Sequence, residues 1–433
     1  MFVLGILVFF VGVLFSVAWH ELGHFVAARR FGIKVPEFMV GFGRTIWSVK
    51  RGETEYGLKA IPLGGYIRMI GMIPPARGEL LGSSRRTGPF QGLIDDVRAQ
   101  SQMDVRPEDA DRQFYLRAPW KRIVVMAAGP FMNLVLAVIL FAVLLMGIGT
   151  NTGTTTTVST VSACVISAQQ AEQGVTECPP GAPPSPAAAA GFLPGDVIVA
   201  VEGRAVSAAE WPAVQEVIRG SAERPITVTV ERGGQRLDLA PRPITTELAA
   251  LDGGPGIVRA GFLGLSPVTF YERQSLGAVF VQIGDVVGRT GEAIVQLPSR
   301  VPSLFGSVFL GEERDVNGPI GVVGVSRIGG EILSQDIPFA AEASLLISLL
   351  AAVNISLFLF NLLPIPPLDG GQIFPALWEA AKKRIWRMRG RPDPGPVDVA
   401  KLMPVAYVVA LVFIVWSGLL LVADVINPVE LFG

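Results

Sequence analysis

Both histidines of this 433-residue chain lie in the stretch HELGH, residues 20–24, directly after a run without charged side chains over residues 2–19. On a helix, positions i and i+4 share a face, so His20 and His24 can bind one metal ion while Glu21 stands beside its open coordination position. Zinc lowers the pKa of bound water to about 7, and a neighbouring carboxylate can take its proton as the water attacks a carbonyl. The spacing therefore predicts amide hydrolysis at one zinc ion per chain, with Glu21 as the general base.

The surroundings of this motif favour metal binding over a chance match on a helix surface. Ionisable side chains within or beside hydrocarbon are costly and usually mark a functional site. Three such groups within five residues need a shared explanation, and metal ligation supplies one.

Composition predicts an α-helical membrane protein. Hydrophobic residues make up 50% of the chain and charged residues only 17%, which is too apolar for one or two soluble domains. Four stretches without Asp, Glu, Lys or Arg approach or exceed the ~20 residues that a helix needs to cross a bilayer. They are residues 2–19 (continuing into the motif), 123–148, 343–368 and 402–423. The net charge of −1 argues against nucleic acid as a partner.

The first apolar run could instead be a cleaved signal peptide. Such a peptide begins with basic residues and ends in small ones at the cut, whereas the first Lys or Arg here is Arg29. We expect the run to stay in the protein, because cleavage would leave His20 at or near a frayed terminus.

The distribution of basic residues predicts the orientation. Residues 29–122 hold 17 of the 36 Lys and Arg, and residues 377–401 hold another seven. Cytoplasmic flanks carry such an excess, so both regions should face the cytoplasm, and residues 150–340 and both termini should face outward. Cys164 and Cys178 fall in the outward part, where a disulfide and two free thiols are both compatible with the sequence.

The metal needs a third protein ligand. Soluble zinc proteases usually supply it from a later helix, which would nominate Glu37, Glu53 or Glu55, but Gly32 and Pro36 break the first helix soon after His24. Asp369 is the better candidate. It ends the third apolar span in NLLPIPPLDGG, residues 361–371, where prolines interrupt a helix and two glycines allow tight backbone approach. The alternative is that Asp369 only caps this turn.

Together, HELGH, GPFMN at residues 129–133 and NLLPIPPLDGG resemble the site-2 protease family of intramembrane zinc metalloproteases. The order of the motifs is similar to the bacterial, regulator of sigma-E protease branch, whose members carry an extracytoplasmic PDZ domain and cleave membrane-bound anti-sigma factors. The resemblance implies that His20, His24 and Asp369 bind zinc and that Glu21 is the base. It also implies that Asn361 helps to hold the substrate backbone. Gln372 departs from the basic residue or His that often follows DGG, which leaves the role of that position open.

Residues 41–72 alternate apolar and polar side chains around the turn signals Arg51-Gly52-Glu53 and Leu63-Gly64-Gly65, which predicts a β-hairpin or small sheet. By resemblance to the family, Gly64, Gly65 and Tyr66 belong to a sheet that dips toward the active site and pairs with an extended substrate. Ordinary surface β-structure is the alternative.

The second-span motif predicts a structural role with only indirect influence on the site. Gly129 and Pro130 allow close helix approach or a kink, and Asn133 can satisfy a freed backbone group.

The outward region begins with a stretch rich in Thr, Ser, Ala and Pro, residues 150–190, which predicts a loose linker or an insertion. Residues 191–270 are similar to a PDZ domain, which captures extended peptides by strand addition. Two roles stay open for it: a peptide-binding groove, and a steric filter against bulky ectodomains, which we favour. Residues 276–297 predict an amphipathic helix on the outer membrane surface rather than a fifth span.

The predicted fold is thus an α-helical polytopic membrane protein with four transmembrane helices, a cytoplasmic membrane-associated β insertion and one extracytoplasmic PDZ domain. Its segments are 1–30, 31–118 (cytoplasmic loop), 119–149, 150–190, 191–270, 271–337 (surface helix and loop), 338–371, 372–401 (cytoplasmic basic loop) and 402–433. The predicted activity is zinc-dependent cleavage in or near the transmembrane segment of a pre-trimmed, anti-sigma-factor-like protein in the bacterial cytoplasmic (inner) membrane. Alternatives are a PDZ membrane scaffold and a zinc transporter, neither of which needs a base beside the metal.

Overall fold

The computed structural model describes residues 1–75, 91–103, 105–165, 178, 182, 184–249, 257–312, 314–315, 318–335 and 337–429. The chain divides into two compact units. The helical unit comprises Met1–Met146 and Ser275–Leu431, and the sheet unit comprises Gly147–Gln274. Each is described by itself.

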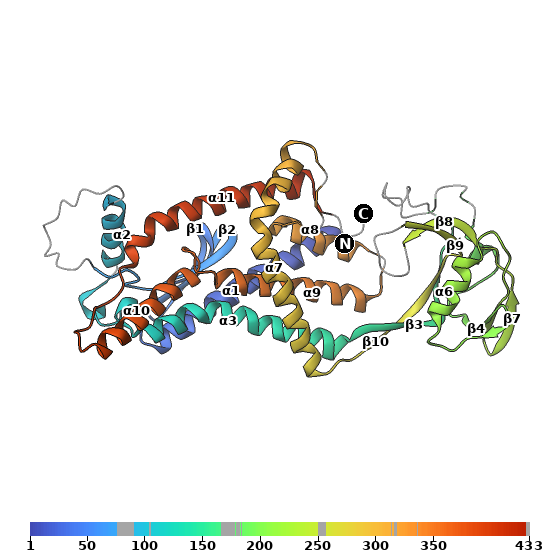
Figure 1. Ribbon diagram of the computed structural model, residues 1–433, viewed down its shortest axis with the longest axis horizontal. Coiled ribbons are helices and arrows are strands. Elements are labelled where there is room, and N and C mark those ends of the chain that lie inside the picture. The colour runs from blue at the N-terminus through green and yellow to red at the C-terminus, as the bar shows by residue number, and fades with distance from the viewer. Residues whose placement is uncertain are drawn as a thin grey trace. The chain divides into compact units, whose positions relative to one another are not determined.

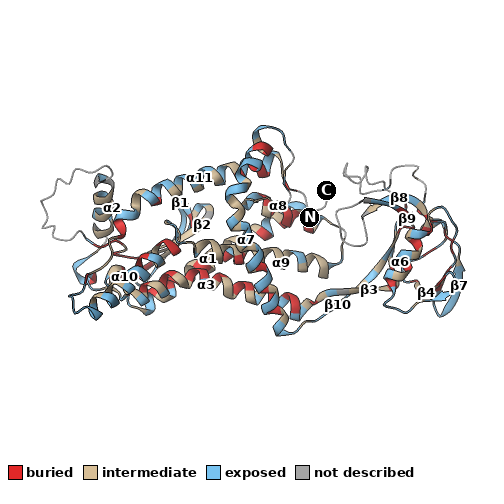
Figure 2. Cartoon of the chain, in the orientation of Figure 1, coloured by how far each residue is buried: buried red, intermediate tan, exposed pale blue. Residues whose placement is uncertain are grey.

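Four helices of the helical unit are long and apolar enough to cross a membrane, which confirms the four predicted spans. They are α1 (Phe2–Arg30), α3 (Pro119–Ala142, continued by a π-helical turn, Val143–Ile148), α9 (Phe339–Asn361) and α11 (Met403–Ile426, preceded by a 3-10 turn, Val399–Leu402). Helix α3 packs against both α1 and α9 (Figure 1). Buried residues line the faces where α1 and α3 meet, so the core of this unit lies along that seam (Figure 2).

Four further helices belong to this unit. They are α2 (Gln91–Met103), α7 (Leu276–Phe309), α8 (Val322–Ser334) and α10 (Gly370–Met388), with short 3-10 turns at Pro107–Asp109 and Phe114–Leu116. The predicted amphipathic helix extends beyond residue 297 to Phe309, and α8 was not predicted. The basic loop predicted at 372–401 is wrong over its first half, because apolar residues spaced by three and four make residues 370–388 a helix.

The predicted β-hairpin is present, as β1 (Glu37–Arg51) and β2 (Thr54–Arg68). The strands are antiparallel, and Gly52 in the turn has φ +63°, a conformation that favours glycine. The second predicted turn is wrong, because Gly64 and Gly65 lie inside β2. The first residues of β1, 37–40, pair with residues 55–58 of β2 and also with residues 65–68. The hairpin therefore bends back on itself.

The sheet unit is a six-stranded sheet with a helix, α6 (Trp211–Gly220), and a separate hairpin. The sheet order is β10-β3-β4-β6-β7, with β5 beside β4, and β8 pairs with β9. The strands are β3 (Thr150–Val161), β4 (Val197–Val201), β5 (Arg204–Ala205), β6 (Val228–Arg232), β7 (Gln235–Leu239), β8 (Ile244–Ala249), β9 (Ile257–Phe262) and β10 (Leu265–Glu272). Val214 and Ile218 of α6 belong to its core with Ile198, Val228 and Val230 of the sheet.

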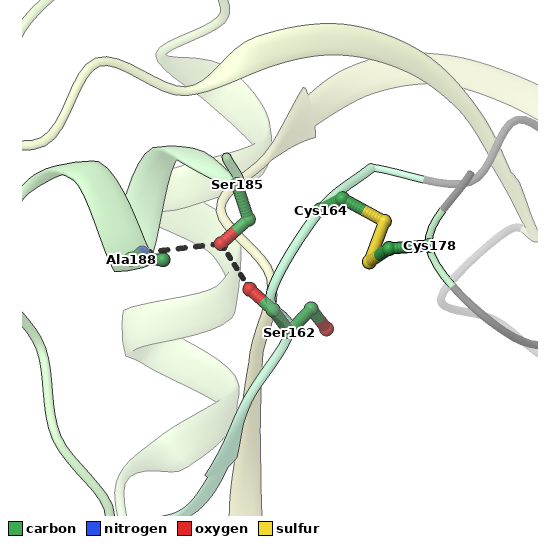
Figure 3. Close-up of a disulfide and its surroundings, with 5 residues drawn as sticks. All are labelled: Ser162, Cys164, Cys178, Ser185 and Ala188. Atoms are coloured by element: carbon green, nitrogen blue, oxygen red, sulfur yellow. Dashed lines mark hydrogen bonds between the residues drawn. A yellow bond between two sulfur atoms is a disulfide. The ribbon is translucent and has the colours of Figure 1, made fainter. Parts of the chain in front are cut away.

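The linker predicted at residues 150–190 is wrong at its beginning. Thr150–Val161 forms β3, which pairs with β10 on one side and β4 on the other. Threonine and valine are β-branched and favour strands. The linker prediction followed the many small residues of the stretch and did not take this preference into account. Much of the remainder of that stretch lies outside the described residues. Cys164 and Cys178 form a disulfide, beside a short helix, α5 (Pro186–Ala189), whose N-cap Ser185 accepts a hydrogen bond from the N–H of Ala188 (Figure 3).

Candidate metal centre

Three side-chain atoms from two parts of the helical unit converge on one point. Nε2 of His20 lies 3.1 Å from Nε2 of His24, and each nitrogen lies 3.2 Å from Oδ2 of Asp369. The three side chains are largely buried. Among the described residues they are the group of histidine, cysteine and acidic side chains whose ligand atoms could hold one metal ion.

This triangle fits a zinc ion. A tetrahedral zinc ion with ligand distances of about 2.0–2.2 Å separates its ligand atoms by about 3.3–3.5 Å, close to the observed spacing. Two imidazoles and one carboxylate form the donor set of hydrolytic zinc sites, which keep the fourth position for water or substrate. The predicted zinc ligands His20, His24 and Asp369 are therefore brought together as a zinc site requires.

Glycines on α1 and α3 allow the two helices to approach closely at the centre. A Cβ atom on Gly129 would lie 2.1 Å from Nε2 of His24, and one on Gly23 would lie 2.3 Å from the carbonyl oxygen of Ala128. Distances below 3.0 Å are not observed for real Cβ atoms. Gly129, the glycine of GPFMN, therefore makes room for the His24 ring.

Helix α3 also contacts the far nitrogen of each imidazole. Nδ1 of His24 lies 2.8 Å from the carbonyl oxygen of Val125, so it donates a hydrogen bond there and leaves Nε2 free for a metal. Nδ1 of His20 lies 3.3 Å from the amide nitrogen of Asn133, whose amide oxygen is buried without a partner. Rotating this amide exchanges its two ends and lets the oxygen accept a hydrogen bond from the protonated Nδ1.

The prediction that the GPFMN motif influences the site only indirectly is therefore wrong. Gly129 and Asn133 contact metal-site histidines themselves. A signal was present in the sequence, because a glycine and an asparagine four residues apart share one face of a helix. Sequence alone could not show that this face meets α1.

Asp369 is the N-cap residue of α10 and follows a turn made of residues 362–368. A Cβ atom on Gly370 would lie 2.2 Å from the carbonyl oxygen of Leu363. A Cβ atom on Gly371 would lie 2.5 Å from the backbone nitrogen of Pro366. The predicted tight backbone approach at these two glycines is confirmed. It brings the first turn of α10 against the preceding loop and places the carboxylate beside α1.

A buried ion pair joins α10 to α3. Glu379 lies 2.5 Å from Arg122 and 3.0 Å from Lys383, and it accepts a hydrogen bond from the N–H of Val397. Burial raises the pKa of Glu379, but Arg122 and these other partners outweigh it, so the pKa is lowered and the carboxylate stays charged. The pair anchors the helix that begins at Asp369.

Glu21 lies where β2 meets α1. A Cβ atom on Gly65 would lie 3.1 Å from Cγ of Glu21. The predicted GGY stretch therefore lies beside the residue predicted to be the base.

Tyr66 and Gly64 are held within the hairpin. The hydroxyl of Tyr66 donates a hydrogen bond to Glu37 at 3.0 Å, and its ring stacks on Phe42 with centroids 6.2 Å apart. Gly64 has φ +107°, and a Cβ atom there would lie 2.7 Å from the Phe42 ring. These contacts fix the shape of β2 next to α1.

The other residues considered from the sequence, Asn361 and three glutamates, are not part of the cluster of donor atoms. The amide of Asn361 donates to the carbonyl oxygen of Leu357 within α9, at 2.9 Å, so the structure gives it no contact with the three donor atoms. Glu53 accepts two hydrogen bonds from Arg112, at 2.7 and 2.8 Å, which lower its pKa. Neither Glu53, Glu37 nor Glu55 belongs to the donor cluster.

Comparison with known proteins agrees with this geometry. Residues 8–392 match the model of peptidase family M50. The chain is 35% identical over 443 residues to zinc metalloprotease Rip1 of Mycobacterium tuberculosis and 32% identical over 447 residues to zinc metalloprotease Rip1 of Mycolicibacterium smegmatis, with 100% of both chains covered in each case. It is 29% identical over 401 residues to metalloprotease MmpA of Caulobacter vibrioides, covering 88% of this chain and 89% of that protein.

Three donor atoms converge, two of them on an apolar helix, and one protease family matches the chain over residues 8–392. The chain belongs to peptidase family M50, the site-2 protease family of zinc metalloproteases.

Proposed function

We propose that this protein cleaves a peptide bond in or near the transmembrane segment of another membrane protein, with its zinc ion held by His20, His24 and Asp369. The single observation that carries the proposal is the triangle of donor atoms, 3.1–3.2 Å on each side, two of which lie on a helix apolar enough to cross a membrane. A zinc ion bound there would polarise the scissile carbonyl and lower the pKa of the attacking water.

Glu21 is the proposed general base. It follows a ligand directly in the sequence, yet it is not one of the three converging donors. Gly65 of β2 lies against its side chain, since a Cβ atom on that glycine would lie 3.1 Å from Cγ of Glu21. A carboxylate held this way can take a proton from the attacking water and pass it to the leaving amine. Neither a scaffold nor a transporter needs such a group.

The stretch Gly64-Gly65-Tyr66 is the proposed substrate-binding segment. Peptide bonds in a helix are shielded, so a transmembrane substrate must be extended before cleavage, and an extended chain can pair with a strand. Two features of β2 support this role: the close approach of Gly65 to the side chain of Glu21, and the absence of side chains at two consecutive positions. Asn361 would act on the substrate backbone only after releasing its bond within α9.

The sheet unit is proposed to be a PDZ-type domain that excludes proteins with bulky ectodomains. Two features support this assignment. A helix, α6, lies beside the sheet, and the terminal strand β10 pairs with only one neighbour among the described strands. The distribution of basic residues supports a location in the bacterial cytoplasmic membrane with this unit and both termini outside. The substrate class would then be single-pass proteins already trimmed outside, such as anti-sigma factors.

The test replaces Glu21 with Gln and compares membrane proteomes of cells with the wild-type and variant proteins. Fragments ending inside a transmembrane segment should appear only with the wild-type protein, and Glu21→Gln should retain one zinc ion per chain. Glu108→Gln, an exposed position, is the matched control. Equal cleavage by both proteins would show that Glu21 is not the base, and loss of zinc from Glu21→Gln would make it a ligand instead.

A further inference from the structure

Helix α10 carries an exposed apolar stripe although it is not one of the spans. Its large members are Phe374, Leu377, Trp378, Ile385 and Met388, which are 41–70% exposed. With Ala381, they occupy an arc of about 100° at 3.6 residues per turn. Beyond the first turn of α10, the buried residues Pro375, Ala376 and Glu379 lie on the other side of the helix, which packs against α3.

Basic residues border this stripe on both edges. At 3.6 residues per turn, Lys382 and Arg389 fall on one edge and Arg384 on the other. Lys382 also lies over the ring of Trp386, 5.6 Å from its centroid. The acidic residue of α10, Glu379, is buried and paired with Arg122, so it does not offset the positive charge of the exposed face.

The position of α10 in the chain indicates what covers the stripe. The helix joins the C-terminal end of α9 to the N-terminal end of α11, and both of these are candidate spans. A segment tethered at both ends to membrane helices stays near the lipid–water boundary. An apolar stripe bordered by Lys and Arg matches acyl chains bordered by phosphates, as in helices that lie in a membrane interface.

We propose that α10 lies in the headgroup layer of the membrane, with its apolar stripe among the acyl chains and Lys382, Arg384 and Arg389 bound to phosphates of anionic phospholipids. The charge pattern favours this partner over a neutral lipid, because only an anionic headgroup neutralises both edges. Since Asp369 is the N-cap of α10, the lipid contact also restrains the depth of the third zinc ligand.

The experiment places a fluorescent label in the stripe of the full-length protein. The two native cysteines form a disulfide, so a cysteine introduced as Ala381→Cys can be labelled selectively with an environment-sensitive fluorophore. The protein is reconstituted in nanodiscs of phosphatidylcholine alone or with phosphatidylglycerol, and quenching by aqueous iodide is measured. Each basic residue raises partitioning to an anionic surface about five-fold, so quenching should fall at least five-fold in the anionic discs.

Charge variants test the source of the protection. Lys382→Gln, Arg384→Gln and Arg389→Gln together should return quenching in anionic discs to the value in neutral discs. Arg387→Gln is the matched control, because Arg387 lies on α10 away from the stripe and should leave quenching unchanged. Unchanged zinc content confirms that the triple variant is folded. If the triple variant does not fold, the comparison of the Ala381→Cys protein in neutral and anionic discs still tests the proposal.

Two results would overturn the proposal. Equal quenching in neutral and anionic discs would show that α10 does not recognise anionic lipid. Protection that persists in detergent and rises with protein concentration would assign the stripe to a second copy of the chain instead.

Discussion

The side-chain amide of Asn133 lies 3.3 Å from Nδ1 of His20, so α3 contacts the far side of a proposed zinc ligand on α1. Nε2 of His20 faces Asp369 and His24, and when that nitrogen binds zinc, Nδ1 must carry the proton. A hydrogen-bond acceptor at Nδ1 fixes both the tautomer and the ring orientation. The unpartnered oxygen of Asn133 is such an acceptor when its amide is turned.

Asn133→Ala should therefore weaken zinc binding by about 10- to 100-fold, the usual cost of losing a hydrogen-bond partner behind a zinc ligand. The measurement is zinc retention by the purified protein against a competing chelator. Ser356→Ala is a matched control, because Ser356 hydrogen-bonds only to its own helix, at Ala352. Unchanged zinc retention in Asn133→Ala would show that the amide does not orient His20.

Gly129→Ala should remove zinc more completely, because the added methyl carbon would lie 2.1 Å from Nε2 of His24. The His24 ring must then move, and its Nε2 no longer points at the metal position. Zinc content after purification and proteolytic activity both measure the effect. Gly418→Ala on α11 is the control, since nothing lies within 4 Å of the added carbon there. Full zinc occupancy in Gly129→Ala would show that the two helices separate at little cost.

The convergence of His20, His24 and Asp369 could be predicted from the sequence, because their geometry is local or marked by unusual residues. His20 and His24 share a helix face whatever surrounds them. Asp369 was found because prolines and glycines surround the acidic residue at the end of an apolar span. Asn133 was not assigned to the centre, because the face that α3 turns to α1 depends on the packing of two distant segments.

The predicted secondary structure was wrong in two segments, where the composition of the segment was given more weight than the spacing or β-branching of its residues. Residues 372–401 were expected to be a loop because they are basic, although apolar residues at helical spacing run through residues 374–388. Residues 150–161 were expected to be a linker because they are rich in small polar residues, although a threonine-rich run is a good strand once a neighbour such as β10 pairs with it.

The buried pair between Arg122 and Glu379 should matter for both stability and zinc. Glu379→Gln leaves a buried guanidinium without its counter-charge and should lower the free energy of unfolding by about 3–5 kcal/mol. Zinc retention should fall with it, because α10 holds Asp369. Titration with SDS measures the unfolding. Glu108→Gln breaks the exposed pair with Arg106 and should cost less than about 1 kcal/mol. Similar losses in the two variants would contradict the role assigned to burial.

The ion pair between Asp196 and Arg232 should make the stability of the sheet unit depend on pH. Arg232 donates to both carboxylate oxygens of Asp196, at 2.7 and 2.8 Å, and the N–H of Leu193 donates at 2.9 Å. Burial raises the pKa of Asp196, but these bonds and the charge of Arg232 outweigh it, so its pKa is lowered. A carboxyl with a lowered folded-state pKa stabilises the fold above its unfolded pKa of about 3.9. That stability is lost as the pH falls through the folded value.

Asp196→Asn removes the charge at every pH and isolates this contribution. Hydrogen exchange of the β4 and β6 amides in the full-length protein should show faster opening in the variant than in the wild type near neutral pH. The difference should shrink below about pH 4, because the wild-type carboxyl is then increasingly protonated. Glu216→Gln, on the exposed face of α6, should match the wild type throughout. A difference between Asp196→Asn and the wild type that stays constant from pH 7 down to pH 2 would contradict the assignment, since it would depend on side-chain shape and not on the charge of Asp196.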